Sequence, residues 1–202
     1  MKDQVLSRRQ LLKGAGAVGV LGALGIPATV FAGDEEVELL RWDLVHFPQG
    51  VGLPGQCMAK DATTGDVVTL TGTGQIEPKK GIAAGGGTFV HNHANGTEVA
   101  HGVYIVTGFV SFTPAGGSLA GVGLTDGIGD INRTIGGLIV LQVQLRPAGG
   151  SPLAGVLHVD CDIPGVEFHI EEGVNLTVGP FHFEKAGGFT DFHVLQGVNQ
   201  TN

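Results

Sequence analysis

The sequence is poor in the residues that build several common kinds of functional site. It has two cysteines, one tryptophan and one tyrosine among 202 residues, and no Cys-x-x-Cys pair. This argues against a zinc site made of cysteines and against an aromatic platform for carbohydrates. Lysine and arginine number 11 against 19 aspartates and glutamates, which gives a formal charge of −8. So few cations argue against nucleic acid as a partner, because the counterions of a phosphate backbone would have to be replaced.

Long apolar runs are missing beyond the N-terminal part of the chain. Residues 14–31 are mostly apolar, but five glycines and Pro27 interrupt them. A membrane-spanning helix needs about 20 predominantly apolar residues, and glycine and proline are poor helix formers. A cleaved signal is therefore the preferred interpretation of this run, and a retained membrane anchor is the alternative. No integral membrane span is expected in the rest of the chain.

The residues before this run carry an export motif. Residues 7–13 read Ser-Arg-Arg-Gln-Leu-Leu-Lys. This resembles the twin-arginine motif of the Tat pathway, with Leu11 at the position where phenylalanine is commonest. Val30 and Ala32 occupy positions −3 and −1 of a cleavage site, so we expect cleavage after Ala32. The resemblance implies export in the folded state, to the periplasm or beyond. It leaves open whether a cofactor is inserted before export or the chain simply folds fast.

We expect two parts: a Tat signal peptide over residues 1–32, and a single Gly-rich all-β domain over residues 33–202. The signal holds four of the 11 basic residues and one of the 19 acidic ones. The remaining 170 residues therefore have 7 basic and 18 acidic side chains, a formal charge of −11. That length suits one domain with its own core. A charge well away from zero keeps an exported domain soluble.

Apolar and polar residues alternate through the mature chain, and the periodicity of amphipathic helices is missing. Glycine-rich turns separate the alternating runs, as in antiparallel sheets. We predict an all-β fold, an antiparallel β-barrel or β-sandwich of about 8–9 strands. Long connections are expected at residues 48–66 and 113–136. The predicted strands are residues 37–47, 67–76, 88–93, 98–112, 137–145, 155–161, 166–170, 175–178 and 189–195.

One stretch combines a turn signal with residues that can bind metal. Asn95-Gly96 is typical of a type I′ hairpin turn, which pairs His93 with Glu98 and His91 with Ala100. Residues opposite each other in an antiparallel pair share a face, so His91, His93 and Glu98 are predicted to project together. His101 then faces the other way. Two imidazoles and a carboxylate on one face can bind one divalent metal ion.

The same stretch resembles the first motif of the cupin family, Gly-x5-His-x-His-x4-Glu-x6-Gly. Gly85, His91, His93 and Glu98 match it, whereas Ile105 stands where the last glycine is expected. No second cupin motif follows. The resemblance implies a β-barrel that holds a divalent metal on His91, His93 and Glu98, and an enzyme that depends on this metal.

Three other histidines have a different setting. His169, His182 and His193 each stand between bulky apolar neighbours. Because side chains alternate along a strand, these histidines are predicted on outer, polar faces.

A wider similarity covers most of the mature chain. Short segments resemble a group of small exported bacterial β proteins to which no activity is attached: residues 68–74, 86–89, 96–97, 102–104 and 110–112. Ser111, Ser118 and Ser151 have no nucleophile elbow around them, so the sequence leaves open whether the protein is an enzyme. The leading hypothesis is an exported β-rich binding or structural module. The alternative is a cupin-like metal-dependent enzyme that uses the cluster of His91, His93 and Glu98.

The two cysteines allow two interpretations. In an oxidising compartment Cys57 and Cys161 can form a disulfide, which would contribute ~4–5 kcal/mol through loop closure. Cys161 also alternates with Asp160 after Val159, so it can equally be a small buried hydrophobic residue.

Overall fold

The computed structural model describes residues 37–196 of the chain. The expected signal peptide, residues 1–32, and its cleavage site after Ala32 lie outside the described residues. Residues 37–196 form thirteen β-strands and three short 3-10 turns, η1 (Pro48–Gly50), η2 (Pro78–Lys80) and η3 (Ile131–Arg133), with no α-helix among them. The predicted all-β class is confirmed.

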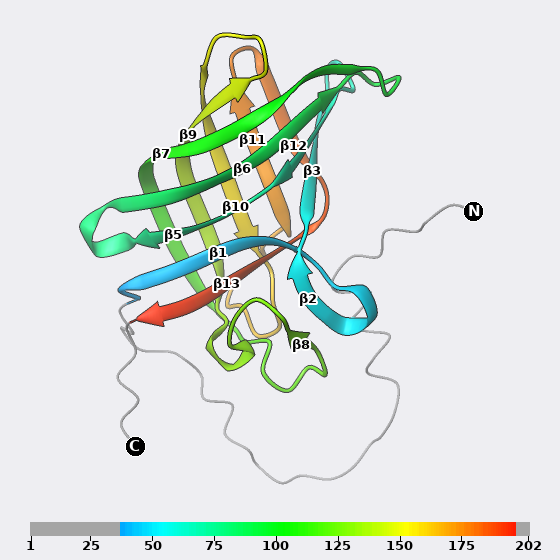
Figure 1. The fold of residues 1–202 in the computed structure, drawn as a ribbon. Coiled ribbons are helices and arrows are strands. Elements are labelled where there is room, and N and C mark those ends of the chain that lie inside the picture. Colours follow the sequence, from blue (N-terminus) through cyan, green and yellow to red (C-terminus); the bar gives the residue numbers. More distant parts are fainter. Residues whose placement is uncertain (1–36, 197–202) are drawn as a thin grey trace, which may run out of the picture.

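Eight of the strands close into an antiparallel barrel (Figure 1). Closure depends on β6, which pairs with β7 along one side and with β4 along the other. The structure is therefore a barrel, the first of the two predicted architectures. In order around the barrel the strands are β4 (Val67–Thr71), β3 (Gln56–Asp61), β12 (Phe181–Gly187), β11 (Gly173–Val178), β10 (Leu153–Cys161), β9 (Gly136–Pro147), β7 (Glu98–Gly116) and β6 (Ile82–Asn92).

The other five strands extend the sheet from the first half of β6. β5 (Thr73–Glu77) pairs with β6 and with β1 (Leu39–His46), and β1 pairs with β13 (Phe189–Gln196). Figure 1 shows β1 and β13 side by side across the lower part of the barrel, at a slant to its strands. Two short strands complete the fold: β2 (Val51–Pro54) pairs with β1, and β8 (Thr125–Asp126) pairs in parallel with β2.

Large side chains from both groups of strands fill the core. Trp42 of β1 and Tyr104 of β7 are almost completely buried, together with leucines and phenylalanines from most strands. Each fully buried side chain of this size contributes about 1.5–3 kcal/mol. The rings approach the backbone so closely that glycine is required beside them. A Cβ on Gly72 would lie 2.0 Å from Tyr104 Oη, and one on Gly74 would lie 2.7 Å from the Trp42 ring.

The long connection predicted at residues 113–136 is a packed element. We define residues 117–135 as the cap segment; it contains β8 and η3. Leu119 is buried, and the apolar side chains Val122, Leu124, Ile131 and Ile135 pack against the main core. β8 lies below β13 in Figure 1, so the cap segment covers the lower side of that strand.

Several predicted strand positions were wrong. Residues 166–170 form no strand, and only Val166 makes an isolated bridge, to Gly116. Residues 48–66 contain β2 and β3, and β12 was also missed. The predicted strand 67–76 is two strands divided at Gly72, where the chain passes from β4 in the barrel to β5 beside β1. The Gly72 carbonyl accepts the Leu44 N–H of β1 at 2.9 Å.

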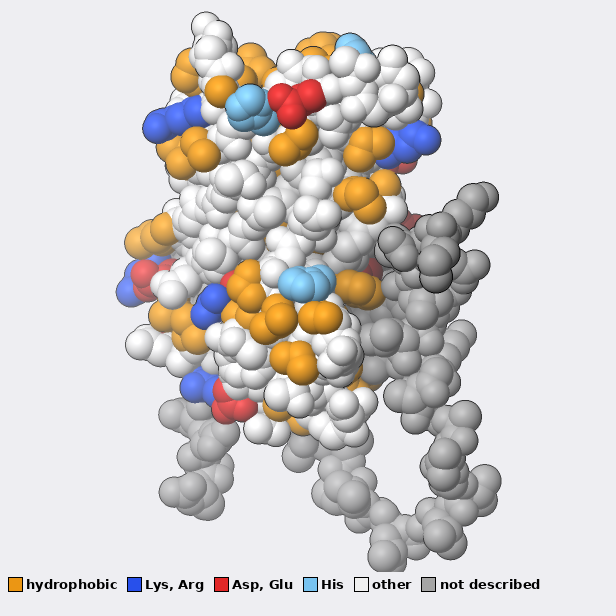
Figure 2. All heavy atoms as spheres, turned by 45° about the vertical axis from the view of Figure 1, so that its right-hand side comes forward, with side chains coloured by type: hydrophobic (Ala, Val, Ile, Leu, Met, Phe, Trp, Pro, Cys, Tyr) orange, Lys and Arg blue, Asp and Glu red, His pale blue; other side chains and the backbone are white. Residues whose placement is uncertain are grey.

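Charge is sparse in the composition and on the face of the molecule that Figure 2 shows. Figure 2 shows one face on which hydrophobic side chains form small groups amid uncharged surface, with only scattered acidic and basic groups. On that face the acidic residues form no continuous patch. Within residues 37–196, no helix has the length and apolar character to cross a membrane.

Candidate functional site

The hairpin between β6 and β7 has a different turn from the one predicted. Gly96 N–H donates to His93 O and His93 N–H donates to Thr97 O, both at 2.8 Å. Gly96 has φ +85°, whereas among the described residues the only non-glycine with positive φ is Gln49. Asn95 therefore lacks the positive φ that a type I′ turn requires. The loop is a type I turn followed by a glycine bulge.

The pairing register also changes beside this turn. His91 pairs with Ala100 as predicted, but Glu98 pairs with Asn92, because Val99 is an extra residue in β7. A bulge of one residue moves the preceding side chain to the other face of the strand. Glu98 accordingly contacts His101, with 2.7 Å between Oε1 and Nδ1. The predicted pairing of His93 with Glu98 is wrong, and Glu98 does not join the two histidines.

Asp66 takes the place beside the histidines that was predicted for Glu98. Its Oδ2 lies 3.0 Å from His91 Nε2 and 3.2 Å from His93 Nδ1. Asp66 directly precedes β4, and β4 pairs with the end of β6 so that Val68 lies opposite His91. Barrel closure thus brings these three side chains together. Asp66 was missed because the pairing of β4 with β6 has no local sequence signal.

The two histidines favour the ionised form of the Asp66 carboxyl. Its side chain is 7% exposed, against 12% for His91 and 57% for His93. Burial opposes ionisation, but the hydrogen bonds and charges of His91 and His93 together outweigh it and lower the pKa of Asp66. In their neutral forms, both rings can donate an N–H to this carboxylate. The Nε2 atom of the exposed His93 ring is then left to accept another group.

The two rings differ in how firmly they are held. His91 packs edge-on against Phe181 and Phe183 of β12, with ring centroids 5.2 and 5.3 Å away. The His93 ring is 6.4 Å from that of His91 and projects further into solvent. His91 is thus a fixed group, and His93 is the one that can turn.

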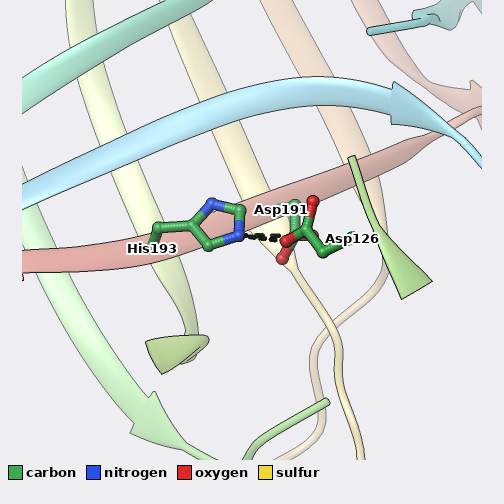
Figure 3. Close-up of side chains that lie close together, drawn as sticks. All are labelled: Asp126, Asp191 and His193. Carbon is green, nitrogen blue, oxygen red and sulfur yellow. Dashed lines mark hydrogen bonds and ion pairs between the residues drawn. The ribbon is translucent and has the colours of Figure 1, made fainter. Parts of the chain in front are cut away.

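A second cluster, outside the predicted site, consists of Asp126, Asp191 and His193. Figure 3 shows the His193 ring directed at the two carboxylates. Among the described residues this is the group of potential metal ligands whose donor atoms all lie within 4.8 Å of one another. His193 is 1% exposed, so its predicted place on an outer, polar face is wrong. The reason is that β13 is covered on both faces, by the core and by the cap segment.

His182 and His169 are exposed, as predicted for both, although His169 lies outside any strand.

The two cysteines are buried thiols. Cys57 Sγ donates to Phe189 O at 3.2 Å, and Cys161 Sγ donates to Thr190 O at 3.5 Å. The structure thus confirms the interpretation of Cys161 as a small buried residue. It does not contain the predicted disulfide between Cys57 and Cys161. Both sulfurs anchor the first residues of β13.

Comparison with known proteins bears on the N-terminus. The family model described as the TAT (twin-arginine translocation) pathway signal sequence matches residues 5–25. No curated protein matches the chain, and no solved structure matches it. The signal match supports export by the Tat pathway. The protein is an exported chain with a β-barrel fold.

Proposed function

We propose that the exported domain, residues 33–202, is a metal-binding module outside the cytoplasm, and that Asp66, His91 and His93 bind one divalent transition-metal ion. The observation that carries this proposal is the carboxylate oxygen shared by two imidazoles, at 3.0 and 3.2 Å. Two atoms bound to one metal at about 2.0–2.2 Å are themselves about 3.0–3.5 Å apart at tetrahedral or octahedral angles. Both carboxylate-to-imidazole separations are within that range.

Binding would require a small movement of one ring. The ring centroids of His91 and His93 are 6.4 Å apart, so the two nitrogens must come closer to share an ion. His93, 57% exposed, can turn toward His91, which Phe181 and Phe183 hold in place. Two imidazoles and one carboxylate suit Zn²⁺, Cu²⁺ or Ni²⁺. The exposed side of the site leaves a coordination position for water or a small ligand.

The cupin-like enzyme remains the less favoured function. Its ligand set needs Glu98, which here contacts His101. The ring contacts of His91 are with His93, Phe181 and Phe183, so none of them supplies a third imidazole. The proposal therefore stops at metal binding.

Titration of the purified protein with Cu²⁺ or Zn²⁺ tests this assignment. Asp66→Asn and the double variant His91→Ala/His93→Ala should each weaken one binding event by about 100-fold or more, because ligands are lost. Glu98→Gln is the matched control and should bind like the wild type. If Glu98→Gln lost the binding event and Asp66→Asn kept it, the ligand set expected from the sequence would be the right one. Equal metal content in the wild type and the double variant would end the proposal.

A further inference from the structure

The second cluster joins the cap segment to β13. Asp126 is the last residue of β8, and Asp191 and His193 are two residues apart on β13, so they share a face of that strand. His193 Nε2 contacts Asp126 Oδ2 directly and lies 4.0 Å from Asp191 Oδ2. One nitrogen and two carboxylate oxygens therefore converge from segments about 65 residues apart in the chain.

The cluster is almost completely enclosed. The side chains of Asp126, Asp191 and His193 are 4%, 1% and 2% exposed. Carboxylates buried to this degree are either paired with other groups or coordinate a metal ion. An imidazole directed at two such carboxylates is an arrangement that can bind a metal ion.

The backbone holds one oxygen of the Asp126 carboxyl. The N–H groups of Ile128 and Gly129 donate to Oδ1 at 2.7 and 3.1 Å. They leave Oδ2 directed at the imidazole, where a metal ion would bind.

The His193 ring is fixed with one side toward the carboxylates. A Cβ on Gly129 would lie 2.6–2.9 Å from three atoms of the ring, so the ring lies flat against the backbone there. Its Nδ1 is buried and has no hydrogen-bond partner among the described residues. The contacts of the ring with polar side chains are thus concentrated on Nε2, the atom that faces both carboxylates.

We propose that Asp126, Asp191 and His193 bind one divalent metal ion of the Zn²⁺ or Mn²⁺ type, and that this ion fastens the cap segment to β13. One imidazole and two carboxylates form a donor set that such ions accept, whereas Ca²⁺ takes six or more oxygens. The donor atoms, within 4.8 Å of one another, need to contract only to about 3.0–3.5 Å around an ion. This site is enclosed and structural, unlike the exposed one at Asp66, and it does not depend on that proposal.

Melting of the metal-stripped protein tests the inference. The experiment uses the His91→Ala/His93→Ala background, so that the Asp66 site gives no signal and the two proposals can fail separately. Zn²⁺ or Mn²⁺ at about 100 times Kd should raise the melting temperature by about 5–10 °C. Asp191→Asn should remove this rise. Asp130→Asn is the matched control, because Asp130 is an exposed carboxylate of the same cap segment whose contacts are local to η3.

A melting temperature unchanged by Zn²⁺, Mn²⁺ and Co²⁺ would overturn the proposal. So would a response of Asp191→Asn equal to that of Asp130→Asn. Co²⁺ loading of the background protein gives a second measurement that needs no change in the cluster, so it does not depend on whether Asp191→Asn folds. Visible absorption bands of four- or five-coordinate Co²⁺ are expected at one equivalent, and their absence at saturating Co²⁺ would also overturn it.

Discussion

Gly72 illustrates how single residues set the packing of this barrel. An added Cβ would lie 2.0 Å from Tyr104 Oη and 3.0 Å from Gly86 O, well inside van der Waals contact. The Tyr104 hydroxyl is itself buried without a hydrogen-bond partner among the described residues, and burial raises the pKa of its phenol. The ring is therefore kept for its size, and its hydroxyl occupies the space that a side chain at position 72 would need.

Replacement of this glycine should expose that conflict. We expect Gly72→Ala to lower the free energy of unfolding by about 1–3 kcal/mol, the usual cost of inserting a methyl group into a packed core. Denaturant unfolding of the wild type and the variant measures the difference.

The partner residue provides the control. Tyr104→Phe should be close to neutral, because it removes a buried hydroxyl that has no partner. In the Tyr104→Phe background, Gly72→Ala should cost less than it does in the wild type. The same cost in both backgrounds would show that the clash with Gly86 O, and not the hydroxyl, is decisive.

At the scale of the element, strand alternation could be predicted from the sequence, but strand pairing could not. The alternating runs gave the all-β class and the position of β7, β9, β10 and β13. The bulge at Val99 could not be seen, because one extra residue leaves the apolar pattern of β7 intact while it turns Glu98 away from the histidines. Glu98 is therefore absent from the predicted metal site because of a local register shift in β7.

Long-range contacts account for two further errors at this scale. Asp66 meets His91 only because β4 and β6 close the barrel. His193 is buried because the cap segment covers a face of β13 that alternation alone predicts to be polar. The failure to predict β3 has a local cause: its inward residues, Cys57 and Ala59, are small, so the apolar alternation of this strand is weak.

The turn at Asn95-Gly96 gives a test at this scale. Gly96→Ala should destabilise the protein by about 1–2 kcal/mol, because Gly96 has φ +85° and no neighbour within 4 Å to add a packing effect. Asn95→Ala should cost less, about 0.5–1 kcal/mol, through loss of the bond from Thr97 N–H to Asn95 Oδ1. Asn95→Asp keeps an acceptor there and should be close to the wild type. An Asn95→Ala cost as large as that of Gly96→Ala would favour the type I′ turn after all. Denaturant unfolding measures all three.

At the scale of the whole molecule, large side chains fill the core, and the two proposed sites lie on different parts of the fold. Trp42 and Tyr104 occupy the interior so tightly that glycines are needed beside them. The Asp66 group lies where β6 ends, and the Asp126 group lies where β13 and the cap segment cross the lower part (Figure 1). One proposed site is open to solvent and the other enclosed. Such a division fits an exchangeable ion at the first site and a permanent one at the second.

Export concerns the whole molecule, because a Tat substrate crosses the membrane in its folded state. Its core, and any ion enclosed in it, are therefore in place before export. Recognition should depend on the guanidinium groups of Arg8 and Arg9, within the segment 5–25 that matches the Tat signal model. A guanidinium offers five donors in a planar fork, whereas a lysine ammonium has the same charge without that geometry. Arg8→Lys/Arg9→Lys should therefore leave the precursor in the cytoplasm even though the charge of the signal is unchanged.

The control for this prediction is Lys2→Arg/Lys13→Arg, which also preserves charge but leaves the arginine pair intact. This protein should be exported normally. Fractionation with immunoblotting distinguishes precursor from mature chain, and N-terminal sequencing should place the start of the mature chain at Gly33. Normal export of the Arg8→Lys/Arg9→Lys protein would mean that the pair is not the recognised feature, and that the charge of the segment is enough.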